Sequence, residues 1–60
     1  MNLWELFQKM VYLTEEIDRR SFRKAKERDI SEIERLDREM DRLMADYLEL
    51  KHRLENINLD

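Results

Sequence analysis

Cysteine, proline and glycine are all absent from the 60 residues of this chain, and each absence excludes a class of structure. Without cysteine there is no disulfide and no thiolate metal site, and the one histidine is too little for a zinc site. Without glycine and proline the chain lacks the usual turn residues of β-hairpins. We therefore expect no metal and no cofactor, and a chain that is helical almost throughout.

The residues that are present have the composition of a coiled coil or a long helix, with 45% charged and 42% hydrophobic residues. A chain of this length forms one domain at most and buries a modest core, so small proteins without disulfides usually depend on association. The net charge of -3 does not fit a general nucleic-acid binder. The first residues, which include Trp4, Glu5 and Lys9, resemble neither a signal peptide nor a membrane span, so we expect a cytoplasmic protein.

The second half of the chain carries a stripe of apolar residues and one tyrosine, spaced alternately three and four apart. The stripe consists of Ile33, Leu36, Met40, Leu43, Tyr47, Leu50, Leu54 and Ile57. Such spacing places the side chains along one seam of a single helix. Ser31 with Glu34 forms a capping-box pattern at its start, and Asp29 is a competing cap. We predict a helix over about residues 31–57.

The first half carries a shorter stripe with the same spacing, formed by Leu3, Leu6, Met10, Leu13 and Ile17. The spacing continued beyond Ile17 reaches Arg20 and Lys24, so the apolar part of the seam stops there. We predict a first helix over about residues 2–26.

The phases of the two stripes indicate two helices rather than one. Counting sevens from Leu3 gives positions 10, 17, 24 and 31, whereas the second stripe starts at Ile33, an offset of two residues. A continuous seam accommodates shifts of three or four residues, and a shift of two fits it poorly. We therefore predict an all-α, coiled-coil-like antiparallel two-helix hairpin over residues 1–60, with its turn at about 27–31. A single long helix in a coiled-coil dimer is the alternative, favoured by the missing turn glycine.

The distribution of charge also favours the hairpin. Residues 19–28 contain six basic and one acidic residue, a net charge of +5, and residues 29–49 contain eight acidic and three basic residues, a net charge of -5. Folding the chain back at residues 27–31 sets these segments side by side. A parallel dimer of the second helix would instead place Glu32 against Asp37 of its mate.

Each helix has more apolar residues than its seam requires. Trp4, Phe7 and Val11 form a second row beside the first stripe, and Met44 and Leu48 lie beside the second stripe. A lone hairpin would leave these side chains partly in water, which is typical of a surface that contacts another chain. We predict that these five residues bind a protein partner or a second copy, so that the hairpin becomes part of a larger helical bundle. The alternative is that they wrap the edges of the hairpin core.

The basic run from Arg19 to Arg28 precedes leucines spaced seven apart, an order similar to the basic region and zipper of DNA-binding proteins. The asparagine with which that family reads bases has no counterpart here, so we expect a solvated face and regard DNA binding as an alternative. We expect no membrane partner, because the apolar N-terminal stretch has little positive charge. We expect no catalytic site in the acidic stretch, because Asp37 and Asp41 share an open helix face that nothing encloses. His52 lies on the outer face of the heptads.

The segment from Ile33 to Tyr47 resembles the second helix of the small sporulation stage-zero aspartyl-phosphate phosphatases of spore-forming bacteria. The residues that match or replace their Ser-Gln-Glu-Leu-Asp signature and the apolar pair and tyrosine after it are Asp37, Arg38, Glu39, Met40, Asp41, Leu43, Met44 and Tyr47. Glu39 and Asp41 match the acids, Met40 replaces the leucine, and Asp37 stands in place of the serine. The resemblance implies a two-helix hairpin that docks on a phosphorylated response regulator and promotes loss of its phosphate, with Glu39 and Asp41 facing the phosphorylation pocket.

Three functions are therefore predicted from the sequence. The first is a small non-enzymatic interaction module, a regulator or adaptor that acts through self-association or docking on a protein. The alternatives are the phosphatase-type regulator implied by the resemblance and a DNA binder with a basic region and a zipper.

Overall fold

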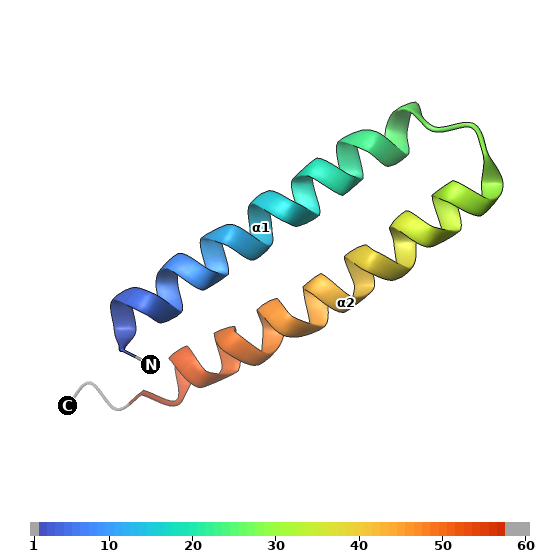
Figure 1. The fold of residues 1–60 in the computed structure, drawn as a ribbon. Helices are drawn as coiled ribbons and strands as arrows, with labels where there is room; N and C mark the ends of the chain where they lie inside the picture. The colour runs from blue at the N-terminus through green and yellow to red at the C-terminus, as the bar shows by residue number, and fades with distance from the viewer. Residues whose placement is uncertain (1, 58–60) are drawn as a thin grey trace.

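The structure, a computed structural model, describes residues 2–57 and consists of two antiparallel helices joined by a short link (Figure 1). Helix α1 spans Leu3–Lys26 and helix α2 spans Ile30–Glu55. The predicted helical hairpin is thereby confirmed, and the alternative of one long helix is wrong because the chain reverses between the two helices. The start of α1 and the end of α2 lie together at the end opposite the link, which we call the open end.

The link closes without glycine because none of its residues needs the left-handed region. No residue in the described part of the chain has a positive φ. Glu27 is extended, with φ -84° and ψ 143°, and its Oε1 accepts the backbone N–H groups of Arg28 and Asp29 at 3.0 and 3.1 Å. One carboxylate thus satisfies two backbone donors that a helix interior would otherwise pair.

The start of α2 differs from the first choice made from the sequence. The N-cap is Asp29, whose Oδ1 accepts the backbone N–H of Ser31 at 3.0 Å, and the helix begins at Ile30. Ser31 is therefore wrong as the cap, because it already lies inside the first turn and its backbone N–H is itself capped by Asp29. The helix ends at Glu55, two residues before the predicted boundary at residue 57.

The core is a narrow seam between the helices. Its buried side chains are Leu6, Met10, Leu13, Leu36 and Leu50. The other stripe residues, Ile17, Ile33, Met40, Leu43, Tyr47 and Leu54, are half-buried. Leu43, Tyr47 and Leu54 pack against a cluster formed by Leu6, Met10, Leu13 and Leu50. In a two-helix hairpin each seam is covered by the opposite helix alone, and the edges of the seam face water. This is why few stripe residues are fully removed from water.

Two predicted core residues, Leu3 and Ile57, are wrong as core. Leu3 is 52% exposed and Ile57 is 37% exposed. Leu3 is the first residue of α1, and Ile57 follows the end of α2. Both residues therefore lie at the open end of the hairpin, where the opposite helix ends and covers a side chain incompletely.

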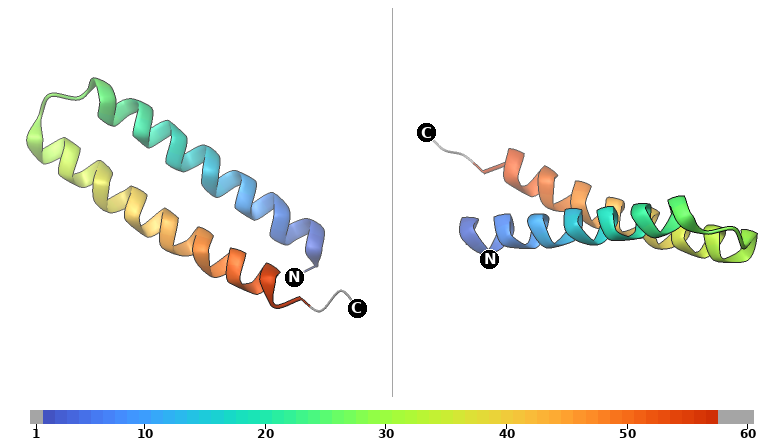
Figure 2. Two further views of the ribbon diagram at one scale, coloured as in Figure 1. Left: turned by 180° about the vertical axis from the view of Figure 1, so that it is seen from behind. Right: turned by 90° about the horizontal axis from the view of Figure 1, so that it is seen from above.

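The molecule is a thin rod with extents of 50 × 14 × 14 Å. The views of Figure 2 show the helices side by side from link to open end, with their axes crossing at a shallow angle. Neither helix, within the residues described, combines the length and apolar composition needed to cross a membrane.

Candidate interaction face

The two long sides of the hairpin differ sharply in chemistry. On each helix, the residues that come immediately before the stripe residues of the seam are mostly charged. Because the helices are antiparallel, these residues of α1 and of α2 lie on the same long side of the hairpin. There, Lys9 and Leu13 of α1 line a shallow hollow together with α2 side chains that include Asp46, Leu50 and Arg53. The residues that immediately follow seam positions therefore share the opposite side of the hairpin.

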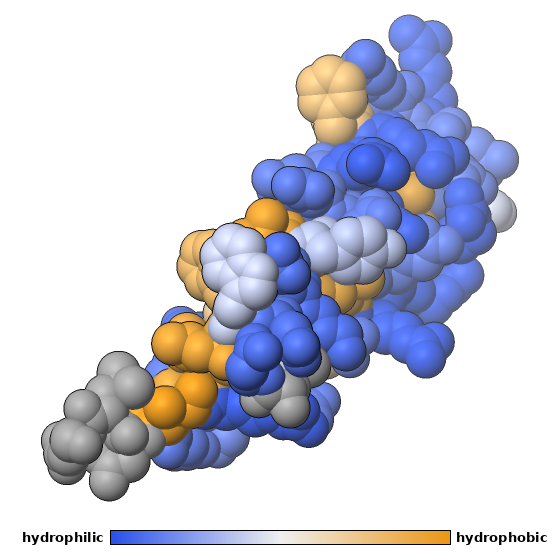
Figure 3. Space-filling view, turned by 60° about the vertical axis from the view of Figure 1, so that its left-hand side comes forward, coloured by the Kyte–Doolittle hydropathy of each residue, from blue (hydrophilic) through white to orange (hydrophobic). Residues whose placement is uncertain are grey.

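Toward the open end, that opposite side is apolar, and we call it the apolar face. It consists of Trp4, Phe7 and Val11 from α1 and Met44 and Leu48 from α2. All five are exposed, from 40% for Val11 to 66% for Trp4. Figure 3 shows hydrophobic side chains gathered toward the open end, while side chains toward the link are mostly hydrophilic, with an exposed hydrophobic ring among them. The structure thus brings the five predicted partner-binding residues onto one side of the hairpin and leaves them in water.

The aromatic residues give this face its shape. The rings of Trp4 and Phe7 are stacked, with centroids 6.5 Å apart and planes 19° from parallel. Both rings line two shallow hollows, one completed by Leu3 and Leu54 and the other by side chains that include Val11 and Tyr12. Flat rings beside open hollows suit the packing of another helix or loop, because aromatic side chains contribute large contact areas at low conformational cost.

Two exposed residues that adjoin the apolar face were missed in the sequence. Leu3 was assigned to the core, and Tyr12, which is 57% exposed, was assigned no role. Tyr12 lines a hollow with Trp4, Phe7 and Val11, but it precedes the seam residue Leu13 and so borders the apolar face from the other side of α1. Phe22 and Ile30 are also exposed, nearer the link.

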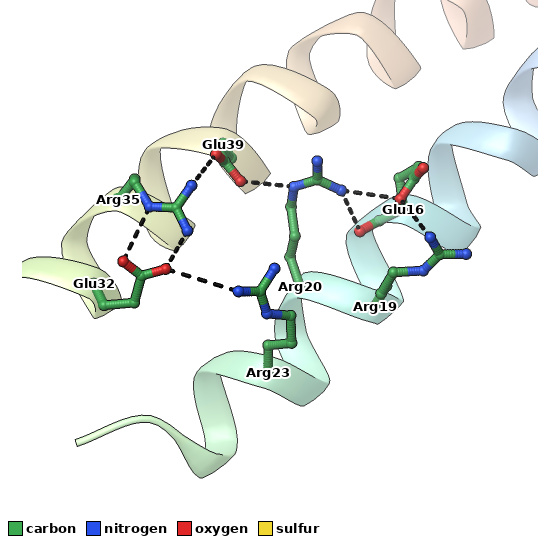
Figure 4. A network of polar contacts seen from close by, with 7 residues as sticks. All are labelled: Glu16, Arg19, Arg20, Arg23, Glu32, Arg35 and Glu39. Atoms are coloured by element: carbon green, nitrogen blue, oxygen red, sulfur yellow. Dashed lines mark hydrogen bonds and ion pairs between the residues drawn. The ribbon is translucent and has the colours of Figure 1, made fainter. Parts of the chain in front are cut away.

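Near the link, the charged side of the hairpin carries a network of ion pairs between the helices (Figure 4). Arg20 is its centre: its Nε donates to Glu39 at 2.9 Å and its Nη1 donates to Glu16 at 3.0 Å. Arg35 joins Glu32 to Glu39, and Arg23 lies 3.9 Å from Glu32. The network occupies the part of the hairpin where the seam of α1 turns from apolar residues to Arg20.

These contacts change the proton affinities of the groups involved. The hydrogen bond from Arg20 is the main cause that lowers the pKa of Glu16, and the hydrogen bond from Arg35 is the main cause that lowers the pKa of Glu32. The hydrogen bonds to Glu39 and Glu32 raise the pKa of Arg20 and Arg35, respectively. Every shift favours the charged form, which is typical of structural ion pairs and provides no neutral acid or base near pH 7.

The basic run of α1 is divided by the fold. Arg20 pairs with Glu39, and the Nζ of Lys24 lies 2.6 Å from Asp37, so both cations connect the two helices. Arg19 and Arg23 remain mostly exposed, and Lys26 lies over the ring of Phe22, 4.2 Å from its centroid. The run is therefore partly used inside the hairpin and is not one continuous basic surface.

The residues that carry the phosphatase resemblance have separate environments. Asp37 pairs with Lys24, and Glu39 pairs with both Arg20 and Arg35. Met40 is half-buried in the seam, and Asp41 is exposed. No three histidine, cysteine, aspartate or glutamate side chains within residues 2–57 gather in a group able to hold a metal ion.

Comparison of the chain with models of protein families, with curated proteins and with solved structures finds no match in any of the three.

Proposed function

We propose that this protein is a small non-enzymatic interaction module, a regulator or adaptor that acts by covering its apolar face with another protein chain. The observation that carries the proposal is the exposure of Trp4, Phe7, Val11, Met44 and Leu48 on one side of the rod. A patch of this kind on a chain with a narrow core is a hydrophobic surface that water solvates poorly. Covering it stabilises the complex and the fold together.

The ion-pair network supports the same proposal, because its side of the hairpin offers a partner little to bind. Glu16, Arg20 and Glu39 satisfy one another, so this side of the hairpin has its charges matched internally. A partner that covered it would have to desolvate these groups for little gain. The apolar face has no such cost.

Photo-crosslinking in cells that produce the protein tests this proposal. A photoreactive residue at Val11 should give covalent adducts with a protein, either a second copy or another chain. The same residue at Arg42, which is exposed on α2 but outside the apolar face, is the matched control and should give few adducts. Equal yields at the two positions, or no adduct at Val11, would overturn the proposal.

The phosphatase resemblance supports a second candidate, a regulator that docks on a phosphorylated response regulator. Its favouring observations are the hairpin architecture and the exposed carboxylate of Asp41. Glu39, which would also face the phosphorylation pocket, would have to leave Arg20 and Arg35 to do so. Incubation with a phosphorylated response regulator tests it: a shortened phosphate lifetime that Asp41→Ala abolishes would support this candidate, and an unchanged lifetime would remove it.

A further inference from the structure

We infer that the chain covering the apolar face is a second copy of this protein, placed antiparallel so that only the open-end halves of the two hairpins overlap. This inference rests on the proposed function and names its partner. It depends on the size of the face, on the carboxylates that bound it and on the order of charges along α2.

The size of the face suits a dimer of two such rods. On the scale of roughly 150–250 Å² for a covered aromatic side chain, the exposed parts of Trp4 and Phe7 with their aliphatic neighbours amount to roughly 500 Å². Two copies then bury about 1,000 Å² of mostly apolar surface, near the lower limit for a specific interface. A hairpin with five buried side chains within residues 2–57 gains stability from this burial, and a second copy is present wherever the chain is made.

Carboxylates limit how far two copies can overlap. Asp18, Glu34 and Asp41 each come directly after a seam residue, so they lie on the same side as the apolar face but nearer the link, and all three are exposed. Full overlap in the antiparallel sense would press Trp4 and Phe7 of one copy against this acidic half of the other. Full overlap in the parallel sense would set like charges face to face. Overlap of the open-end halves alone keeps the carboxylates at the edges, in water.

The charges along α2 complement each other when the helix is reversed. Asp41, Met44, Leu48 and Lys51 are consecutive members of one row, with the acid at the link side and the base toward the open side; the row continues to Glu55, whose Oε1 lies 4.0 Å from the Nζ of Lys51 in the same copy. A two-fold axis across the middle of this row sets Leu48 near Met44 of the second copy and Lys51 near Asp41 of the second copy. Because such a contact is isologous, it forms twice in each dimer.

The row on α1 is consistent with the same axis. The Arg20–Glu39 pair and the hollow shared by Leu13 and Asp46 place Val11 level with about residue 48 of α2, within one helical turn of the middle of the α2 row. An axis through the middle of the α2 row, at about residue 46, is level with Leu13 and sets Val11 within about one helical turn of Val11 of the second copy.

A charge exchange between positions 41 and 51 tests the inference. These positions are ten residues apart on one helix, about 15 Å, so their side chains cannot meet within a single copy. Lys51→Glu and Asp41→Lys should each weaken the dimer by roughly tenfold, because both isologous contacts become repulsive. The double variant, with both exchanges, should recover most of the lost affinity. Sedimentation equilibrium over a concentration series measures the dissociation constants.

The control is Arg42→Glu, an exposed charge reversal on the same helix but outside the row, which should leave the dissociation constant unchanged. Circular dichroism of each variant establishes that the helices are retained. Small-angle scattering of the wild-type dimer should give a maximum dimension of about 70–75 Å, from two 50 Å rods overlapping by about 27 Å over residues 4–22.

Three results would overturn the inference: a wild-type monomer at high micromolar concentration, single exchanges without effect, or a double variant as weak as the singles. A dimer only about as long as one hairpin would overturn the partial overlap. A wild-type monomer combined with Val11 adducts to a different protein would overturn this inference while leaving the proposed function intact.

Discussion

Replacing Leu36 by alanine should unfold most of the protein, because among residues 2–57 Leu36 is the side chain that the fold removes completely from water. The change deletes three methylene-sized groups at roughly 0.8 kcal/mol each, and the cavity left behind raises the total cost to about 2–5 kcal/mol. A core of this size rarely provides more than about 3–5 kcal/mol in all. A loss of about 3 kcal/mol lowers the ratio of folded to unfolded chains by more than a hundredfold.

Leu48→Ala is the matched comparison, because it deletes the same groups from a side chain that is 52% exposed on the same helix. In a dilute sample the change should lower the free energy of unfolding by about 1 kcal/mol or less. About half of the Leu48 side chain is already in water, so less apolar surface returns to water, and no cavity forms. Thermal unfolding followed by circular dichroism compares the two variants with the wild type, with the same series of protein concentrations used for all three.

The two variants should also differ in how they respond to concentration. Leu36→Ala should be destabilised at every concentration, whereas Leu48→Ala should fall further behind the wild type as the concentration rises, because it removes part of the apolar face. A Leu36→Ala variant that melts with the wild type would refute the description of the core. Equal destabilisation of the two variants in dilute samples would refute the distinction between core and face.

The remaining predictions concern charges and caps. Because folding lowers the pKa of Glu16 and Glu32, the unfolded state binds more protons, so their stabilisation is complete well above the ordinary glutamate pKa of 4.5 and is lost as the pH falls through the folded values. The melting temperature should therefore fall on acidification, and the doubly substituted Glu16→Gln, Glu32→Gln variant should show a flatter pH dependence; equal slopes would contradict the role given to these pairs. Asp29→Ala should cost about 1 kcal/mol in urea unfolding, because it removes the acceptor for the Ser31 amide, whereas Ser31→Ala should cost much less. The reverse order would restore Ser31 as the cap.

Much of the fold could be predicted because the relevant signals are local. The two stripes define helix faces by spacing alone, and the two-residue offset between Leu3 and Ile33 places a break between them. The opposite net charges of residues 19–28 and 29–49 anticipate the pairing of Arg20 and Lys24 with α2. The choice of Asp29 over Ser31 could not be settled in advance, because both patterns fit the same helix and one residue in the backbone path decides between them.

The candidate site shows the same division. Five surplus apolar residues were evident from spacing alone, because a seam in a two-helix hairpin accommodates one stripe per helix. Their gathering on a single side of the rod required the antiparallel packing, since sequence spacing describes each helix alone and does not place two helices relative to each other. The same packing left Leu3 and Tyr12 exposed beside them.

By itself, the sequence of this protein determined that two amphipathic helices form and which face of each is apolar, because helical periodicity is written in the order of the residues. Tertiary structure alone decided that Arg20 joins Glu16 to Glu39 across the seam and that Trp4 is left in water, since both outcomes depend on which side chains of α2 lie level with α1. The physical reason is that burial and pairing are properties of two surfaces in contact, and a single helix possesses neither.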